Sequence, residues 1–426
     1  MTINFTSLGI RPEAQDLLRQ DGVSVPTAIQ AQAIGPLLAG KDALIQAQTG
    51  TGKTLAYLLP LLEKLQPQKP HTQAVIIAPT RELALQISEV ASRLAGLYGV
   101  EILSVCGGQD VDRQIVRLKT GIQLIVGTPG RILDHVRRRS IDLAGVTRLV
   151  IDEADQMLAM GFIEDVEAII GQISAKRQLM LVSATLPGKI RELASHYMRK
   201  PVSLSVQTAT VTLDKITQLV IETSEEGKID VLCRLIDEYR PYLALVFCHT
   251  KQRAIMVGTA LAQRGYAADE LHGDLSQTKR EQVMRRFSSA KLQILVATDI
   301  AARGLDIEAV THVINFDIPH DPETYIHRIG RTGRAGESGV AATLVTPPES
   351  RYLRLIERGI QATLAKRGAD GQLIVRKPAR PRAKPSATTG KATAAKPAHA
   401  GSNNRSRRKP KPAAGGRPER KPARRK

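Results

Sequence analysis

The segment ALIQAQTGTGKTLAYLLPLLEKL, residues 43–65, decides the fold of this chain. It opens with a short apolar run, continues through a loop with glycines at 50 and 52, and closes with an apolar stretch of helical length. A strand that leads through such a loop into a helix predicts backbone N–H groups that cradle phosphates. We expect Lys53 to neutralise β- and γ-phosphate charge and Thr54 to hold Mg²⁺.

The predicted nucleotide loop begins with Ala47, where such loops usually carry Gly. By itself the loop indicates only that the chain binds a nucleoside triphosphate. Its residues are Ala47, Gln48, Thr49, Gly50, Thr51, Gly52, Lys53 and Thr54.

Short apolar runs alternate with amphipathic, helix-like stretches on both sides of this loop. We interpret the runs as buried parallel strands of doubly wound α/β sheets. They lie at residues 43–47, 74–78, 102–105, 123–127, 148–151 and 179–185, and again at 218–222, 243–248, 292–298 and 311–316. This restart in a chain of 426 residues predicts two α/β domains. The expected parts are 1–207, a linker at 208–214, 215–368 and a tail at 369–426.

The positive charge of the chain is concentrated at its C-terminal end. Residues 371–426 hold 18 Lys or Arg and one acid, and thus +17 of the net charge of +20. Residues 378–426 contain no Val, Ile, Leu, Met, Phe, Tyr, Trp or Cys, so little apolar surface offsets the entropy of ordering them. We predict a disordered tail that neutralises nucleic-acid phosphates; the alternative is a tail that only keeps the protein in solution.

The cysteines and the hydropathy indicate the cellular setting. Cys106, Cys233 and Cys248 have no Cys or His partner at a metal-ligand spacing, so we interpret them as reduced and structural. The N-terminus lacks a signal-peptide pattern, and no apolar run reaches the roughly 18 residues that span a bilayer. We expect a cytoplasmic protein with no membrane contact.

An acidic pair, Asp152 and Glu153, follows the apolar run at 148–151 directly. Ligands in open α/β folds lie at the carboxyl ends of the strands, where these side chains emerge. We expect Asp152 to bind the Mg²⁺ shell and Glu153 to orient or deprotonate the attacking water. The alternative is an acidic helix N-terminus that is favoured only by the helix dipole.

Further motifs follow in a fixed order along the chain. They are AQTGTGKT (47–54), PTRELA (79–84), TPGR (128–131), DEAD (152–155), SAT (183–185), ATDIAARGLD (297–306) and HRIGRTGR (327–334). With these motifs, residues 1–360 resemble the DEAD-box RNA helicases. The resemblance implies two RecA-like domains that close on ATP and single-stranded RNA, and a bend in the bound strand that separates short duplexes.

The resemblance also implies how adenine is recognised. Residues 22–30 look like the family's adenine-reading motif, with Phe5 as its isolated upstream aromatic residue. The amide of Gln30 can both donate to and accept from the adenine edge. The alternative is a Thr-x-x-Gln capping box, in which Gln30 reaches back to a helix N-terminus that begins at Thr27.

By the same resemblance, the second domain completes the ATP site. Arg331 and Arg334 are implied as arginine fingers, and Asp306 as a contact to the ribose side of ATP. The alternative for the arginines is a basic loop that contacts RNA. Ser183, Thr185 and His327 are implied to couple the ATP state to RNA binding.

The RNA contacts implied by the resemblance are hydroxyls, arginines and exposed backbone, which suit phosphates and 2′-hydroxyls rather than base edges. We therefore expect a weak sequence preference. Thr80 taken alone would instead be a helix N-cap. The implied residues are Pro79, Thr80, Arg81, Gly107, Gly108, Thr128, Pro129, Gly130, Arg131, Thr298, Asp299 and Arg303.

These features predict a monomeric ATP-dependent RNA helicase. RNA-stimulated, Mg²⁺-dependent ATP hydrolysis would drive local unwinding or remodelling of RNA–protein complexes, in ribosome assembly, cold adaptation or RNA decay. Its expected partners are RNA and proteins of those processes. The alternative function is an ATP-gated RNA clamp or annealing protein that acts through the basic tail, and phosphate contacts alone leave DNA open as a substrate.

Overall fold

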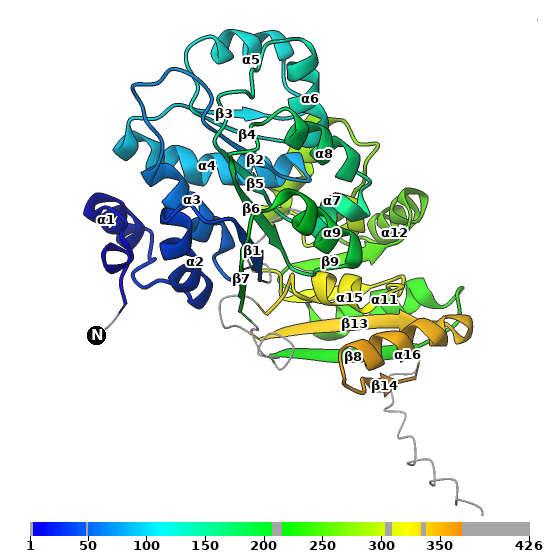
Figure 1. Ribbon diagram of the computed structural model, residues 1–426. Coiled ribbons are helices and arrows are strands. Elements are labelled where there is room, and N and C mark those ends of the chain that lie inside the picture. The colour runs from blue at the N-terminus through cyan, green and yellow to red at the C-terminus, as the bar shows by residue number, and fades with distance from the viewer. Residues whose placement is uncertain (1–2, 48–49, 207–214, 303–308, 334–337, 369–426) are drawn as a thin grey trace, which may run out of the picture. The chain divides into compact units, whose positions relative to one another are not determined.

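The computed structural model describes residues 3–47, 50–206, 215–302, 309–333 and 338–368. Within these ranges the chain forms two parallel sheets with helices packed against them (Figure 1). The predicted pair of tandem α/β domains is thus confirmed. The predicted linker at 208–214 and the predicted tail at 369–426 lie outside the described residues.

The first sheet has the strand order β3-β4-β2-β5-β6-β1-β7, and all of its neighbouring strands are parallel. Its strands are β1 (Ala43–Gln46), β2 (Ala74–Ile77), β3 (Ile102–Val105), β4 (Leu124–Gly127), β5 (Arg148–Ile151), β6 (Gln178–Ser183) and β7 (Val202–Ser205). The helices of this half are α1 (Pro12–Gln20), α2 (Ala28–Leu38), α3 (Lys53–Glu63), α4 (Arg81–Tyr98), α5 (Val111–Leu118), α6 (Pro129–Arg137), α7 (Ala154–Ala159), α8 (Ile163–Gly171) and α9 (Gly188–Tyr197), after the short 3-10 turn η1 (Thr6–Leu8).

The second sheet has the order β10-β11-β9-β12-β13-β8-β14 and is also parallel throughout. Its strands are β8 (Ile216–Glu222), β9 (Ala244–Cys248), β10 (Ala268–Leu271), β11 (Ile294–Thr298), β12 (His312–Asn315), β13 (Gly339–Val345) and β14 (Ala365–Arg367). The helices are α11 (Lys228–Tyr239), α12 (Lys251–Gln263), α13 (Gln277–Ser288), α14 (Asp299–Ala302), α15 (Pro322–Ile329) and α16 (Ser350–Gly359), with a 3-10 turn η3 (Pro347–Glu349).

Helices cover both faces of each sheet. Because successive side chains of a strand point in opposite directions, one strand contributes residues to both cores. In β2, Ala74 and Ile76 enter one core, which α1 to α4 cover, while Val75 and Ile77 enter the other, which α6 to α9 cover. All four residues are fully buried. Strands buried in this way read as continuous apolar runs, which is why the sequence pattern located them.

The two sheets share one strand order, with β8 in the place of β1 and β12 in the place of β5. A lysine begins the helix after each matched strand: Lys53 begins α3, and Lys228 begins α11. Lys228 is fully buried and forms ion pairs with Glu225 (3.2 Å), Asp317 (3.5 Å) and Glu349 (3.3 Å). In contrast, the part of the chain described here provides no ion pair for Lys53.

Candidate functional site

The phosphate loop lies between β1 and α3. Gly50 and Gly52 have φ angles of 82° and 85°, in the left-handed region that strains any residue with a Cβ. Gly52 is the N-cap of α3, so the free N–H groups of the first helical turn are at the loop. Lys53 is only 7% exposed there. Of the other predicted loop residues, Ala47 is buried, Thr51 and Thr54 are half-buried, and Gln48 and Thr49 lie outside the described residues.

Gln30 joins α2 to the phosphate loop. Its Oε1 accepts from the backbone N–H of Thr27 at 2.8 Å, so the capping box that the sequence offered as an alternative is formed. Its Nε2 donates to the carbonyl oxygen of Gly52 at 3.1 Å, and a Cβ at position 52 would collide with this amide. Phe5 is fully buried in the core beneath α1 to α4. Adenine recognition by Gln30 and Phe5 stays a prediction.

Asp152 follows β5 at the edge of the sheet that carries the phosphate loop. Its Oδ2 accepts from the Tyr57 hydroxyl at 2.7 Å, and its Oδ1 accepts from the N–H of Glu153 at 2.9 Å. Burial raises the pKa of Asp152, and the positive charge of Lys53 opposes that rise. The carboxylate is therefore fixed in orientation and lies within the field of Lys53.

Glu153 is the most unusual residue of the site. Its φ of 53° is left-handed although it is not glycine, and it is 5% exposed. Its Oε2 has no hydrogen-bond partner within the described ranges. Burial raises its pKa to about 7, against the opposing charges of Lys53 and Arg331. A buried carboxyl group with a free oxygen and a pKa near neutrality has the properties of a general base.

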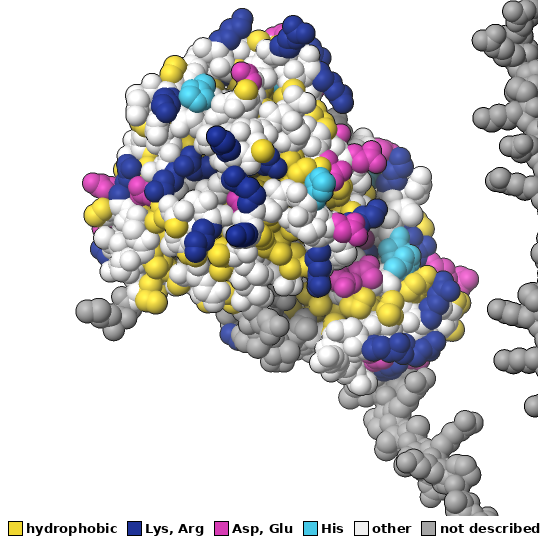
Figure 2. Space-filling model, viewed as in Figure 1, with side chains coloured by type: hydrophobic (Ala, Val, Ile, Leu, Met, Phe, Trp, Pro, Cys, Tyr) yellow, Lys and Arg dark blue, Asp and Glu magenta, His cyan; other side chains and the backbone are white. Residues whose placement is uncertain are grey.

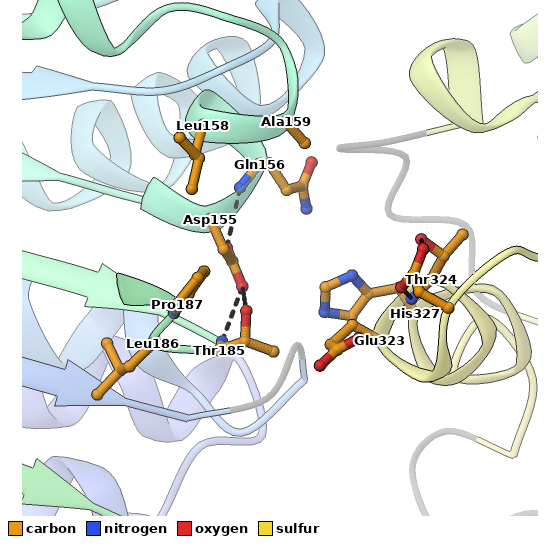
Figure 3. Close-up of a pocket in the computed structure, with 11 residues that line it drawn as sticks. Asp155, Gln156, Leu158, Ala159, Thr185, Leu186, Pro187, Glu323, Thr324 and His327 are labelled. Atoms are coloured by element: carbon orange, nitrogen blue, oxygen red, sulfur yellow. Dashed lines mark hydrogen bonds between the residues drawn. The ribbon is translucent and has the colours of Figure 1, made fainter. Parts of the chain in front are cut away.

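Two of the predicted coupling residues, Thr185 and His327, line one pocket of about 490 Å³. Asp155 Oδ2 accepts from both the N–H (2.7 Å) and the hydroxyl (2.9 Å) of Thr185. Ser183 Oγ accepts from the N–H of Asp155 at 3.2 Å and donates to the Thr185 carbonyl at 2.6 Å. Figure 3 shows the imidazole of His327, on α15, pointing toward this group from the opposite wall. The structure thus brings Ser183, Thr185 and His327 together.

The PTRELA segment caps α4 and contacts the second half of the chain. Thr80 accepts from the N–H of Leu83 at 3.3 Å, as an N-cap does. Arg81 donates to the Gly107 carbonyl at 2.8 Å and forms an ion pair with Glu281 of α13 at 3.1 Å. An RNA phosphate would compete with Glu281 for this guanidinium group, so RNA binding by Arg81 stays a prediction.

A buried hydrogen-bond network supports the other predicted RNA-facing loops of the first half. Arg131 donates to the carbonyl of Gln109 at 3.2 Å and to Gln114 Oε1 at 3.0 Å. Gln114 Nε2 donates to Gln109 Oε1 at 2.8 Å, and His135 Nε2 lies 2.9 Å from Gln114 Oε1. The sequence analysis missed Gln114 and His135. Of the predicted residues, Thr128 is the N-cap of α6, Pro129 and Gly130 follow it, Gly108 has φ of 74°, and Pro79 is buried.

Cationic side chains are spread over the face of the molecule seen in Figure 2, among polar and apolar groups. In the second half, Thr298 ends β11 and is 9% exposed. Asp299 accepts two hydrogen bonds from Arg328, at 2.6 and 2.7 Å. Arg328 is buried and also donates to the Asp317 carbonyl at 2.7 Å, so this arginine of the HRIGRTGR motif anchors the fold.

Arg331 is 8% exposed, and its charge acts on Glu153 across the two halves of the chain. This proximity is consistent with the predicted arginine finger, whose role nevertheless stays a prediction. Three predicted residues, Arg303, Asp306 and Arg334, lie outside the described ranges.

The described helices include none that is both long and apolar enough to cross a membrane. Cys106, Cys233 and Cys248 are buried and free, as expected for structural cysteines. Among the residues that the structure describes, His, Cys, Asp and Glu form no group of three or more suited to a metal ion. A bound Mg²⁺ would therefore depend on ligand oxygens as well as on Thr54 and Asp152.

The fold and the site together define a nucleoside-triphosphate-binding protein of two RecA-like halves. A family model described as DEAD/DEAH box helicase matches residues 27–193, and one described as helicase conserved C-terminal domain matches residues 227–336. Among solved structures, S. cerevisiae Dbp5 bound to RNA and ADP BeF3 matches with a TM-score of 0.78 at 32% identity. This match covers 86% of this chain and 96% of that chain.

Curated relatives agree over most of the chain. The DEAD-box ATP-dependent RNA helicase CshA of Bacillus subtilis (strain 168) is 48% identical over 358 residues, which is 84% of this chain and 72% of the relative. CshA of Geobacillus kaustophilus (strain HTA426) is 50% identical over 354 residues, covering 83% of this chain and 76% of the relative. This chain belongs to the family of DEAD-box ATP-dependent RNA helicases, and the resemblance inferred from its motifs is confirmed.

Proposed function

We propose that this chain hydrolyses ATP in an RNA-stimulated, Mg²⁺-dependent reaction and uses the energy to separate short RNA duplexes or to displace RNA-bound protein. Glu153 carries the proposal. It is a buried carboxyl group whose pKa is about 7 and whose Oε2 accepts no hydrogen bond from the described residues. It also lies within the field of Lys53, the residue that begins α3 at the end of the phosphate loop.

In the proposed reaction, Lys53 holds the β- and γ-phosphates while Glu153 accepts a proton from the attacking water. The water oxygen bonds to the γ-phosphorus as the bond to the leaving ADP oxygen breaks. Thr54 and Asp152 offer the hydroxyl and carboxylate oxygens that Mg²⁺ takes together with substrate phosphates. Mg²⁺, when bound, neutralises charge that develops on the phosphates.

The proposed site is split between the two halves of the chain. Gln30 reads adenine, Asp306 contacts the ribose side, and Arg331 and Arg334 stabilise the γ-phosphate when the halves close on it. The effect of the Arg331 charge on Glu153 supports this arrangement. RNA that contacts both halves would then favour closure and so stimulate hydrolysis.

RNA binding is proposed to depend on the backbone rather than on the bases. The segments that carry the proposed contacts are 79–81, 107–108 and 128–131 in the first half and 298–303 in the second. We further propose that the protein acts in the cytoplasm as a monomer, on RNA of ribosome assembly, cold adaptation or RNA decay and alongside the proteins of those processes.

Strand separation of a short RNA duplex over many rounds tests the proposal. Lys53→Ala should lose nucleotide binding. Glu153→Gln and Arg331→Ala should keep nucleotide binding and lose turnover, by roughly 10²–10⁴-fold for the base and 10³–10⁵-fold for the finger. All three should fail to unwind, while RNA should stimulate the wild-type ATPase more than DNA of the same sequence does.

The exposed Glu164→Gln on α8 is the matched control and should behave as the wild type. Repeated unwinding by Glu153→Gln would overturn the proposal and favour an ATP-gated clamp or an annealing protein. Equal stimulation by DNA and RNA would overturn only the choice of nucleic acid.

A further inference from the structure

Tyr57 is a fully buried residue of α3 that the proposed reaction does not use. It lies three and four residues after Thr54 and Lys53, and side chains at these spacings share one face of a helix. Its hydroxyl donates to Asp152 Oδ2 at 2.7 Å. The phosphate-loop helix is therefore bonded directly to the carboxylate that follows β5.

This hydrogen bond is formed in the interior of the protein. Asp152 is 3% exposed, and Tyr57 is fully buried. A buried carboxylate needs hydrogen-bond donors in place of water, and the Tyr57 hydroxyl supplies one of them.

The two donors to Asp152 also fix its rotation. Tyr57 donates to Oδ2 and the N–H of Glu153 donates to Oδ1, so each oxygen has one protein partner and keeps lone pairs for other ligands. The Thr54 side chain interacts with the same Tyr57 hydroxyl. One phenol thus contacts both side chains that would hold Mg²⁺.

Packing alone does not account for a tyrosine at this position. The core around α3 is apolar, with Ala56, Leu58 and Leu59 all fully buried beside Tyr57. A phenylalanine ring would fill the same space without burying a polar group, which costs free energy unless it is hydrogen-bonded. The function of the hydroxyl must therefore be sought in its polar partners.

We propose that Tyr57 is a positioning residue of the ATP site, whose hydroxyl orients Asp152 for the Mg²⁺ that accompanies the nucleotide. The inference rests on the proposed function, because it assumes Mg²⁺-dependent nucleotide binding at this loop. It differs from that function in being testable by binding alone, without turnover.

Tyr57→Phe removes the hydroxyl and keeps the ring. The measurement is equilibrium binding of a fluorescent ADP analogue to the full chain, first in EDTA and then at rising Mg²⁺ concentration. We expect the Mg²⁺ concentration at half-maximal enhancement to rise about 10-fold or more, as is typical when a residue that orients a metal ligand is lost. Binding in EDTA should equal that of the wild type.

Tyr98→Phe is the matched control. Tyr98 is 5% exposed, and its hydroxyl donates to Glu63 Oε1 at 2.9 Å at the far end of α3. This variant loses the same kind of bond, between a buried phenol and a carboxylate, away from the loop. Its Mg²⁺ dependence should match the wild type, and thermal unfolding of each variant reports any loss of fold separately.

A double-mutant cycle tests whether Tyr57 acts through Asp152. In the Asp152→Asn background, Tyr57→Phe should change the Mg²⁺ dependence no further. If the single Tyr57→Phe variant does not fold, the Asp152→Asn variant can still be compared with the double variant. The Asp152 carboxylate is absent from both of these proteins, so the phenylalanine ring does not leave a buried charge without its donor.

Three results would overturn the role of Tyr57: an unchanged Mg²⁺ dependence in Tyr57→Phe, an equal loss of binding in EDTA, or additive effects in the cycle. If wild-type nucleotide binding does not respond to Mg²⁺ at all, the proposed Mg²⁺ site itself fails, and the inference fails with it.

Discussion

At the scale of single residues, Glu153 shows that this site is not arranged for stability. It combines a left-handed φ of 53° with a buried carboxyl oxygen that no described residue satisfies. Backbone strain of this kind costs of order 1–3 kcal/mol and persists where the surrounding structure enforces it. Here β5 and the start of α7 enforce it from both sides.

The pKa of Glu153 predicts how the free-energy cost of burying its ionised carboxyl group depends on pH. Because its folded-state pKa of about 7 lies above the ordinary 4.5, the folded protein binds this proton more tightly than the unfolded chain does. The ionised group therefore destabilises the fold fully above pH 7, and the cost disappears as the pH falls toward 4.5. We expect Glu153→Gln to stabilise the ligand-free protein at pH 8 by up to roughly 3 kcal/mol.

Unfolding midpoints at pH 8 and pH 5 check this prediction. The gain in Glu153→Gln should narrow at the lower pH, whereas the exposed Glu164→Gln should leave the midpoint unchanged at both. A gain of the same size at pH 5 would show that the substitution acts by something other than the charge of Glu153.

Residue identity alone predicted much of this site but not its hydrogen bonds. The strand before Asp152 and the glycines before Lys53 located the acid pair and the loop. Tyr57 gave no signal, because in sequence it is one more apolar residue of a helix with a buried face. The position of Gln30 in the sequence suits both adenine recognition and a capping box. Only the hydrogen bonds to Thr27 and Gly52 show that its amide is used within the protein.

At the scale of elements, Gln114 connects α5 to α6 and to the loop between β3 and α5. It is 4% exposed, and its amide contacts Gln109, Arg131 and His135. Its partners lie up to 21 residues away along the chain, so no local pattern could reveal it. Such a residue holds two loops that are predicted to contact RNA in a fixed relation.

We expect Gln114→Ala to weaken RNA binding. Removing the amide leaves buried partners unsatisfied, at a cost of about 1–3 kcal/mol, part of which would appear as lost loop order. The RNA concentration for half-maximal ATPase stimulation should rise roughly tenfold, equivalent to 1.4 kcal/mol, while binding of ADP in the absence of RNA stays as in the wild type.

Gln123→Ala is the control for this substitution. Gln123 is an equally buried glutamine of the same half, and it donates to the carbonyls of Pro67 and Lys69 at 3.4 and 3.2 Å. Those partners lie between α3 and β2, and Gln123 directly precedes β4, so this contact is away from the loops that follow the strands. If both substitutions raise the RNA concentration for half-maximal ATPase stimulation equally, the effect comes from a general loss of stability and not from displaced loops.

Three strands of the second sheet lie outside the predicted apolar runs, for two physical reasons. β10 (Ala268–Leu271) and β14 (Ala365–Arg367) are the edges of the second sheet and carry polar side chains, so they lack a continuous apolar run. β13 (Gly339–Val345) is central but begins with Gly, Val, Ala and Ala, which have too little bulk to read as a buried strand. The central strands with bulkier apolar side chains were predicted within a few residues.

At the scale of the whole molecule, the charge distribution predicts separable functions. Residues 371–426 carry most of the net charge, while the motifs of the ATP site end before them. A chain that ends at residue 368 should bind RNA more weakly, and log affinity should fall less steeply with log salt, because each phosphate contact contributes about one unit of slope. Turnover at saturating RNA should stay as in the full chain.

Replacing residues 369–426 by an uncharged segment of equal length gives the matched control and should reproduce the truncated chain. A salt dependence equal to that of the full chain would mean that the tail makes no phosphate contacts. It would also favour the alternative in which the tail only keeps the protein in solution.

The matched lysines of the two sheets have a consequence for how the protein responds to metabolite levels. Lys228 carries its counter-ions within the chain, in Glu225, Asp317 and Glu349, whereas no described residue forms an ion pair with Lys53, although its charge acts on Asp152 and Glu153. A ligand that binds only the folded state adds about 2.7 kcal/mol of stability at 100 times its dissociation constant. Nucleotide that occupies the phosphate loop should therefore make the folded chain more resistant to heat and proteolysis as its concentration rises, whereas the charge of Lys228 is balanced without any ligand.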